Sequence, residues 1–429
     1  MKKKYRNFKI NKDLIKNSKY YIPDIHQISK NTESNTWFDI TKYNFDSKDF
    51  VPKNINNDKI KSVKICKQIQ LYPNENQKKL IGKWMECSRI VYNLTVSFIR
   101  NNKIESFYNI RKKIHNIYSN SLRQYIINYN VPCTVLDNAI HDVIKAYKTS
   151  FSLLKTKQIS HFRIRYKKIT NSIKTIAIEK QAFNKDKTGF FVRYLGREMK
   201  SSEKIDLVNS TCRLTYSLIK NQYILSVPID KNCVANIGKQ KICSIDPGNK
   251  TFLTTYSPNG DCYKIFNRDN RTKLSKLLKR RIKLLKLKKS TKLSKFSKAI
   301  LKNNRLVMNL VKELHYKSAL YLLNRFNVIY LGNLSTKGIT SKTKKMYSFE
   351  KIYTYAVSHY KFQTILEQKA KEYNIEVNIV NEAYTTMTCG KCGTLNKNVG
   401  SSRIFNCLDC GISIDRDLNG ARNILIKNN

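Results

Sequence analysis

Residues 381–425 read NEAYTTMTCGKCGTLNKNVGSSRIFNCLDCGISIDRDLNGARNIL, and this stretch contains two Cys-x-x-Cys pairs separated by fourteen residues. A glycine, Gly393 or Gly411, follows the second cysteine of each pair, as expected where a tight turn presents two thiolates. Two such turns that face each other form a closed tetrahedral site of soft sulfur ligands, which favours a structural Zn²⁺ ion over two separate redox pairs. The predicted zinc ligands are Cys389, Cys392, Cys407 and Cys410.

The segment upstream, residues 241–267, reads KICSIDPGNKTFLTTYSPNGDCYKIFN. It contains three short strands divided by the turns PGN and PNG, which indicates an antiparallel meander. After it we expect a helix (273–325), a strand (327–334), a helix (349–373), a strand (376–384), the cysteine segment and a last helix (417–427). This succession is that of the RNase H fold. We therefore expect an RNase H-like α/β domain at residues 236–429, with a zinc ribbon inserted at about residues 386–412.

The N-terminal half divides into two parts. Residues 1–60 are rich in Lys and Asn and sparsely apolar, so we expect a basic, loosely ordered extension. In residues 61–235, apolar residues recur at helical spacing over about residues 74–158 and alternate in short runs elsewhere. A β-rich module with a helical insertion is the simplest interpretation of residues 61–235.

The charge balance indicates the partner. The chain has 82 Lys+Arg against 30 Asp+Glu, a formal net charge of +52, and an excess of this size repels itself unless a polyanion neutralises it. Nucleic acid is the expected polyanion, and a merely solvated basic surface is the alternative. Neither a signal-peptide h-region nor an apolar stretch of about 18 residues occurs, so we expect a soluble, intracellular protein without membrane partners.

An RNase H-like core that cuts nucleic acid needs carboxylates around two divalent cations, for which hard oxygen ligands select Mg²⁺ or Mn²⁺. Asp246 follows an apolar strand and fits the first carboxylate, although it could simply open an Asp-Pro-Gly turn. The last helix offers Asp415 and Asp417. We expect Asp415 to cap the helix and Asp417 to be catalytic, because Gly420 and Ala421 share the face of Asp417 and allow close packing.

A third acid is expected at the end of the strand 327–334, but Gly332 and its neighbours carry no carboxylate. Glu382, at the end of the next strand, is the candidate replacement, because neighbouring strands lie only about 4.8 Å apart. On these residues alone Glu382 could equally be an ordinary surface glutamate, and the site could be inactive.

Five motifs in order, IDPGNKTFLTTYSPNG, VKELHYKSALYL, NEAYTTMTCGKCG, CLDCG and DRDLNGARNIL, resemble the C-terminal half of TnpB-like proteins and of their eukaryotic and viral relatives, the Fanzor proteins. Weaker matches, LYPNENQKKLIGKW, SRIVYN and ISHFRIRYKK, resemble the wedge-like and recognition modules of the family, so the resemblance runs from about residue 61 to the end. It implies a β-barrel-like wedge module with a helical recognition insertion, followed by a RuvC-type nuclease domain.

The resemblance also implies an RNA-guided DNA endonuclease of a mobile element, related to type V CRISPR nucleases and formerly described as a transposase. In such proteins a guide RNA pairs with the target DNA, the protein reads a short flanking motif, and a single RuvC site cuts. By position, Asp246 corresponds to the first acid and Asp417 to the last. Most TnpB proteins have Glu where this chain has Gly332, whereas Fanzor-like members have it where Glu382 stands. One protomer per guide RNA is expected, with a nuclear location if the host is eukaryotic.

Two basic segments are candidate nucleic-acid contacts. In KLSKLLKRRIKLLKLKK, leucines share one helix face, and cations stand beside them. We expect these cations to contact phosphates. The alternatives are a helix on a membrane surface or a plain solvated face. HFRIRY interleaves cations and aromatics, which suits stacking, or a strand with one face in the core. The predicted contact residues are Lys276, Lys279, Arg280, Lys283, Lys286, Arg163, Arg165 and Tyr166. A nuclease-inactive nucleic-acid-binding protein, such as a guided repressor or transposon accessory factor, is the alternative to an enzyme. A conventional transposase is a weaker one.

Overall fold

A computed structural model gives two compact units, Met1–Val63 with Asn232–Asn429 (unit 1) and Lys64–Lys231 (unit 2), and each is described by itself. The structure describes residues 29–34, 38–44, 62–102, 104–184, 189–196, 199–205, 208–233, 241–267, 272–291, 294–336, 340, 348–397, 399–400 and 402–428.

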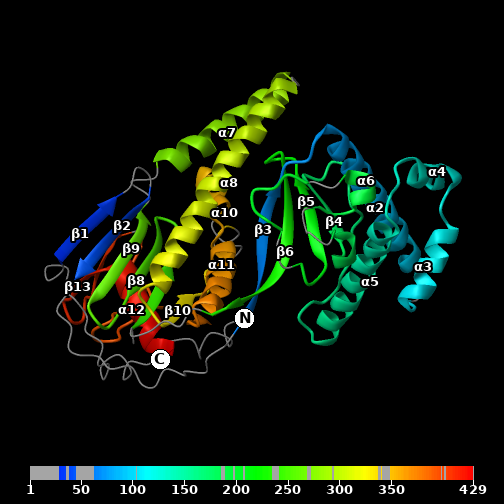
Figure 1. Ribbon diagram of the computed structural model, residues 1–429. Coiled ribbons are helices and arrows are strands. Elements are labelled where there is room, and N and C mark those ends of the chain that lie inside the picture. The colour runs from blue at the N-terminus through cyan, green and yellow to red at the C-terminus, as the bar shows by residue number, and fades with distance from the viewer. Residues whose placement is uncertain are drawn as a thin grey trace. The chain divides into compact units, whose positions relative to one another are not determined.

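Unit 2 combines an antiparallel sheet, in the order β3-β6-β5-β4, with a group of helices (Figure 1). Its core is built around α2, which begins at a capping box of Asn74 and Gln77 and buries Trp84 completely. The described residues record no pairing of β3 with β4, so the barrel-like form stays a prediction. The elements are β3 (Ser62–Leu71), α2 (Glu75–Asn101), α3 (Phe107–Asn116), α4 (Asn120–Asn128), α5 (Cys133–Lys155), β4 (Ile173–Ile178), η3 (Lys180–Ala182), α6 (Val192–Leu195), β5 (Cys212–Ser217) and β6 (Gln222–Asn232).

Unit 1 is built on a mixed sheet in the order β1-β2-β9-β8-β7-β10-β11. The expected meander is present: β7 (Ile242–Pro247), β8 (Thr251–Tyr256) and β9 (Asp261–Asn267) are antiparallel neighbours. β10 (Val328–Gly332) lies parallel to β7, and β11 (Glu376–Val380) lies parallel to β10. The parallel pairs bring the C-terminal ends of β7, β10 and β11 to the same end of the sheet. Asp246 is the last residue but one of β7, and Glu382 stands two residues after β11.

The two outermost strands at the β1 side of this sheet come from a segment that we expected to lack regular structure. β1 (Ser29–Ser34) and β2 (Asp39–Asn44) belong to residues 1–60, which we expected to be loosely ordered, and β2 pairs antiparallel with β9. The short alternation around Phe38 and Ile40 explains this pairing, because both side chains are buried in the core of unit 1. The rest of residues 1–60 lies outside the described part of the chain.

Helices cover both faces of the unit 1 sheet (Figure 1). Successive residues of β7 serve opposite faces, since Cys243 belongs to the core under α8 and α11 and Ile242 to the core under α12. Each of the two long helices expected from the sequence is divided in two. α11 begins only after Ser358, whose left-handed backbone (φ 50°) ends α10. The helices are α7 (Thr272–Thr291), α8 (Ser294–Leu323), α10 (Ser348–Val357), α11 (His359–Glu372) and α12 (Arg416–Asn428). None of the described helices combines the length and the apolar character that crossing a membrane requires.

Candidate functional site

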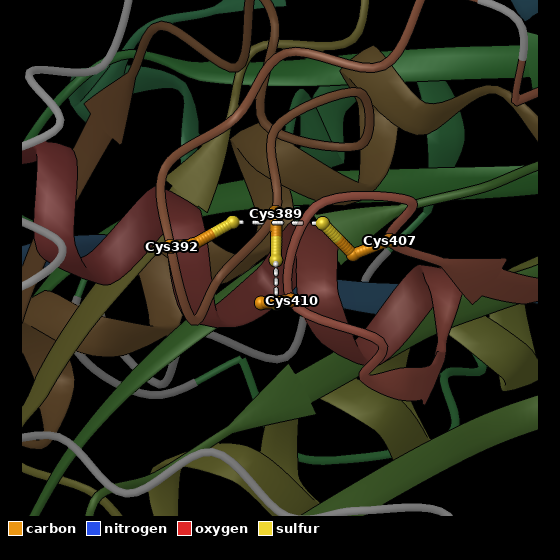
Figure 2. Close-up of side chains that lie close together, drawn as sticks. All are labelled: Cys389, Cys392, Cys407 and Cys410. Carbon is orange, nitrogen blue, oxygen red and sulfur yellow. Dashed lines mark hydrogen bonds between the residues drawn. The ribbon is translucent and has the colours of Figure 1, made fainter.

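The four predicted zinc ligands lie together. Figure 2 shows the side chains of Cys389, Cys392, Cys407 and Cys410 pointing toward one another, and their sulfur atoms all lie within 4.8 Å of each other. The Sγ–Sγ distances are 3.6 Å between Cys389 and Cys410 and 3.5 Å between Cys392 and Cys407. A tetrahedral ion with metal–sulfur bonds of about 2.3 Å needs sulfur atoms about 3.8 Å apart. The cluster therefore fits a metal ion held by four thiolates.

Local backbone structure presents these sulfur atoms. The amide of Gly393 donates to the carbonyl of Cys389 at 3.0 Å, and the amide of Gly411 donates to that of Cys407 at the same distance. Both glycines have a positive φ, 75° and 70°, a conformation that side chains with a Cβ adopt at a cost. The repeated turn explains why a glycine follows each pair.

A short hairpin connects the cluster to the last helix. β12 (Ile404–Asn406) and β13 (Ser413–Asp415) pair antiparallel and bury Phe405 and Ile414 beside the cysteines. Since β13 runs directly into α12, the position of the ribbon and the start of α12 are linked.

Asp415 caps α12, as expected. Its Oδ1 accepts hydrogen bonds from the backbone amides of Asp417 and Leu418 at 3.1 and 3.0 Å. Its Oδ2 lies 2.5 Å from the Nζ of Lys264 on β9. Burial alone would lower the pKa of Lys264, but the charge of Asp415 and the Tyr43 hydroxyl raise it above its ordinary value. Asp415 is therefore fully engaged in structural contacts.

Asp246 lies at the end of β7 against α12. A Cβ added to Gly420 would stand 2.6 Å from Asp246 Oδ2 and 2.9 Å from Thr386 Cγ2, so only glycine leaves room for the carboxylate. Burial, followed by the charges of Glu382 and Asp417, raises the pKa of Asp246 well above its ordinary value. The three predicted acids are thus close enough to interact.

Glu382 fills the space that Gly332 leaves. A Cβ added to Gly332 would stand 2.6 Å from Glu382 Oε2, so a side chain on β10 and the observed position of Glu382 exclude each other. Burial raises the pKa of Glu382 to about 7, and among the described residues its Oε2 has no hydrogen-bond partner. Glu382 is therefore not an ordinary surface glutamate.

The acids converge less closely than the thiolates. Within the part of the chain that the structure describes, the four cysteines are the group whose ligand atoms all lie within 4.8 Å, and the three acids do not form such a group. Asp417 lies in the first turn of α12, with its Oδ1 at 3.5 Å from the guanidinium of Arg416. The three carboxylates are therefore neighbours that remain separated.

Three residues of α12 that support the site were not predicted from the sequence. Asn419, Arg422 and Asn423 are buried, and their side chains bind the backbone that leads into the ribbon. Asn419 and Asn423 donate to the carbonyl of Thr388 at 2.8 and 2.9 Å, and Arg422 donates to that of Gly390 at 2.6 Å. Polar residues in the otherwise buried motif NGARNIL were the available signal, because buried polar side chains need partners.

All five cations of α7 that we predicted to contact phosphates are exposed to solvent. The leucine face beside them is covered only in part, since Leu274 and Leu278 are buried while Leu285 is 40% exposed. Nucleic-acid contact by this helix stays a prediction.

The segment HFRIRY, residues 161–166, has no regular secondary structure and is therefore not a strand. Phe162 and Ile164 pack against the core of unit 2, whereas Arg163 and Arg165 are exposed. The guanidinium of Arg100 lies 4.2 Å from the ring centre of Tyr166, so one face of that ring is already occupied. The packing of one side of the segment against the core is therefore observed, although the segment is not a strand. Stacking of its other side on nucleic acid stays a prediction.

Two family models match parts of the chain. Residues 359–424 match the model described as Cas12f1-like, TNB domain, a range that contains Glu382, the four cysteines and Asp417. Residues 63–102 match a model described as a helix-turn-helix domain. In this structure that range contains β3 and the single long helix α2.

Three known proteins show how far the similarity extends. A TnpB-like protein of Acanthamoeba polyphaga mimivirus is 29% identical over 381 residues, which cover 83% of this chain and 72% of that protein. The CRISPR-associated endodeoxyribonuclease Cas12f1 of Sulfoacidibacillus thermotolerans is 36% identical over 72 residues, 17% of each chain. The cryo-EM structure of a Cas12f1–sgRNA–target DNA complex superposes with a TM-score of 0.34 at 17% identity, over 85% of this chain and 99% of the Cas12f1 chain.

Proposed function

Since this chain belongs to the TnpB-like proteins, we propose that it is an RNA-guided DNA endonuclease of a mobile element, with one RuvC-like site formed by Asp246, Glu382 and Asp417. The Cas12f1 relative is an endodeoxyribonuclease and matches over a segment of 72 residues. A guide RNA would select the target by base pairing, and the protein would cut the DNA phosphodiester.

The position of Glu382 is the observation that carries this proposal. Its carboxylate occupies the space beside Gly332, which supplies the β10 end with the acid that β10 itself lacks. Two parts of the chain are therefore complementary in space. The glycine on β10 has no side chain, and the glutamate that follows β11 places its carboxylate in the space left free there.

The electrostatics of the acids favour a cation between them. Asp246 is half-buried beside two like charges, and Glu382 Oε2 has no hydrogen-bond partner among the described residues. Buried like charges are stable together only when they are protonated or neutralised. Carboxylate oxygens suit Mg²⁺ or Mn²⁺, which would activate a water and stabilise the leaving oxygen. The fold itself positions these acids: the end of β7 holds Asp246, and Gly420 leaves room for α12, which carries Asp417, to pack beside it.

We infer that Zn²⁺ occupies the four-thiolate cluster and has a structural role, because all four ligand positions are filled by cysteine. Glu382 stands seven residues before Cys389, and Asp417 stands seven residues after Cys410. The side chains of Asn419 and Asn423 bind α12 to the backbone at Thr388, just before the cluster, and Arg422 binds it to Gly390 inside the first cysteine turn. The ribbon would therefore hold two of the three acids in register.

A nuclease-inactive, guided DNA-binding protein is the competing function, and one observation favours it. Among the described residues, the three acids do not form a group that could hold one ion as the four cysteines do. A conventional transposase, which joins as well as cuts DNA, is the weaker alternative, since no further motif of the sequence calls for strand transfer.

The decisive experiment begins with protein purified together with its bound RNA. That RNA is sequenced, and a DNA duplex that matches it, with randomised flanks, is offered with Mg²⁺. We expect cutting at sites that share one flanking motif, and a loss on the order of 10²-fold in Glu382→Ala. The matched control is Glu376→Ala, an exposed glutamate at the start of β11. Binding without cutting by the wild-type protein would establish the guided binder instead.

A further inference from the structure

A cavity of about 210 Å³ lies in unit 2, whereas the acids and the cysteines belong to unit 1. It is lined by the middle of α2, by the turn that precedes β4 and by the start of β4. A cavity of about 150 Å³ accepts a benzene ring, and pockets for drug-sized ligands begin at about 300 Å³. The volume therefore suits one flat ring system.

The charges around the cavity favour an anion. Arg89, Lys168 and Lys174 line it, and no acidic side chain of the described residues lies within ion-pair distance of any of them. The one acid in the lining, Glu86, already accepts a hydrogen bond of 2.7 Å from the hydroxyl of Tyr125. Three cations without partners beside an engaged glutamate form a site for a phosphate.

The same cavity has apolar walls. Met85 is buried, whereas Ile169 and Ile173 line the cavity with 66% and 57% of their surface exposed. Branched apolar side chains exposed this far leave apolar surface in water, and a flat ring laid against them would cover it. The cavity thus combines a place for a ring with a place for a phosphate.

We propose that this cavity binds one unpaired nucleotide, with its base against Ile169 and Ile173 and its phosphate toward Arg89, Lys168 and Lys174. A base inside a duplex is stacked on both faces, so only an unpaired or extruded base can offer a face to the cavity. The inference rests on the proposed nucleic-acid partners, and the guide RNA or the target DNA can supply the nucleotide. It adds to the guided nuclease a nucleotide site outside the nuclease unit.

Binding of a fluorescent mononucleotide, 2-aminopurine riboside 5′-monophosphate, to the full-length protein freed of RNA tests the site. A mononucleotide has little of the counterion release that makes basic proteins bind long nucleic acids indiscriminately. We expect Arg89→Glu and Lys174→Glu each to weaken binding about tenfold or more, as loss of a charged hydrogen bond does. The control Lys112→Glu makes the same charge change at an exposed lysine of α3, outside the lining, and should bind like the wild type.

Three outcomes would overturn the proposal: pocket variants that bind like the control, inorganic phosphate that competes as well as uridine monophosphate, or Ile173→Ala binding with unchanged affinity. Thermal melting of each variant shows that loss of binding is not loss of folding.

Loading the protein with its RNA, and then with matching DNA, identifies the source of the nucleotide. Displacement of the probe by the RNA assigns the site to the guide, and displacement only on addition of DNA assigns it to the target. A probe that stays bound in the full complex contradicts the proposal. Cutting is measured separately, so a protein that cuts DNA but ignores the probe would fail this inference alone, and one that binds the probe but never cuts would fail the proposed function alone.

Discussion

The two candidate metal centres of unit 1 are assembled in opposite ways. The four thiolates come from two copies of one turn, and their sulfur atoms already lie within 4.8 Å of one another. The three carboxylates come from the end of β7, the segment after β11 and the first turn of α12, and they remain separated. Local backbone structure forms the first centre, whereas the second depends on the space left by Gly332 and Gly420. Like charges repel one another, so a cation is needed to draw the three carboxylates together.

The largest effect should come from breaking the thiolate centre. Cys407→Ser removes one of four ligands, and because structural zinc contributes about 10–16 kcal/mol in small zinc domains, we expect loss of the metal, of the β12–β13 hairpin and of cutting. Metal content per protein molecule, measured by mass spectrometry, checks this. Cys66→Ser, at an exposed cysteine of unit 2, should keep the full content. An unchanged metal content in Cys407→Ser would contradict the four-thiolate site.

The next largest effect should come from moving the third acid back to β10, which tests whether the carboxylate centre needs an acid in this space. In Glu382→Ala the space beside Gly332 is vacant, so Gly332→Glu added to it should recover cutting by about tenfold over the single variant. The recovery should be partial, because the new Cβ would stand 3.1 Å from Ile424 Cδ1 and from Pro247 Cδ, and these must shift.

The control for this rescue is Gly332→Gln in the same Glu382→Ala background, which adds equal volume without an acid. Equal recovery with glutamine and glutamate would mean that the space needs filling and not a carboxylate. Gly332→Glu alone should lower both cutting and stability, since two side chains then compete for one place.

A smaller effect is expected where α12 approaches β7. Gly420→Ala should lower cutting about tenfold, because the new methyl group would displace the carboxylate of Asp246, 2.6 Å away. Stability should change little, since alanine gains about 1 kcal/mol of helix propensity and overpacking costs about 1–3 kcal/mol. Single-turnover cutting and thermal melting measure the two effects. Full activity in Gly420→Ala would show that the position of Asp246 is not critical.

Sequence patterns predict those parts of unit 1 that depend on neighbouring residues in the chain. The meander, the thiolate turns and the cap at Asp415 all follow from short-range patterns. The break at Ser358 and the strand at residues 39–44 escape prediction, because distant packing decides both. The space shared by Gly332 and Glu382 is also a property of the folded chain, since no pattern within either segment reveals it.

The smallest effect on cutting is expected from Asp415→Asn, and comparison with Asp417→Asn separates the roles of the two acids of the DRD motif. Asparagine caps helices about as well as aspartate, so Asp415→Asn should keep α12 and lose only the charge that faces the mostly buried Lys264, at a cost of about 1–3 kcal/mol, with cutting nearly unchanged. Asp417→Asn should do the reverse: cutting falls on the order of 10²-fold, while stability holds or rises because Asp246 loses a like charge. Melting curves and cutting rates of the two variants, taken side by side, test this assignment. If Asp415→Asn abolished cutting and Asp417→Asn did not, the capping and catalytic roles would be exchanged, and the carboxylate centre would have to form around β13 and Lys264 instead of Gly420.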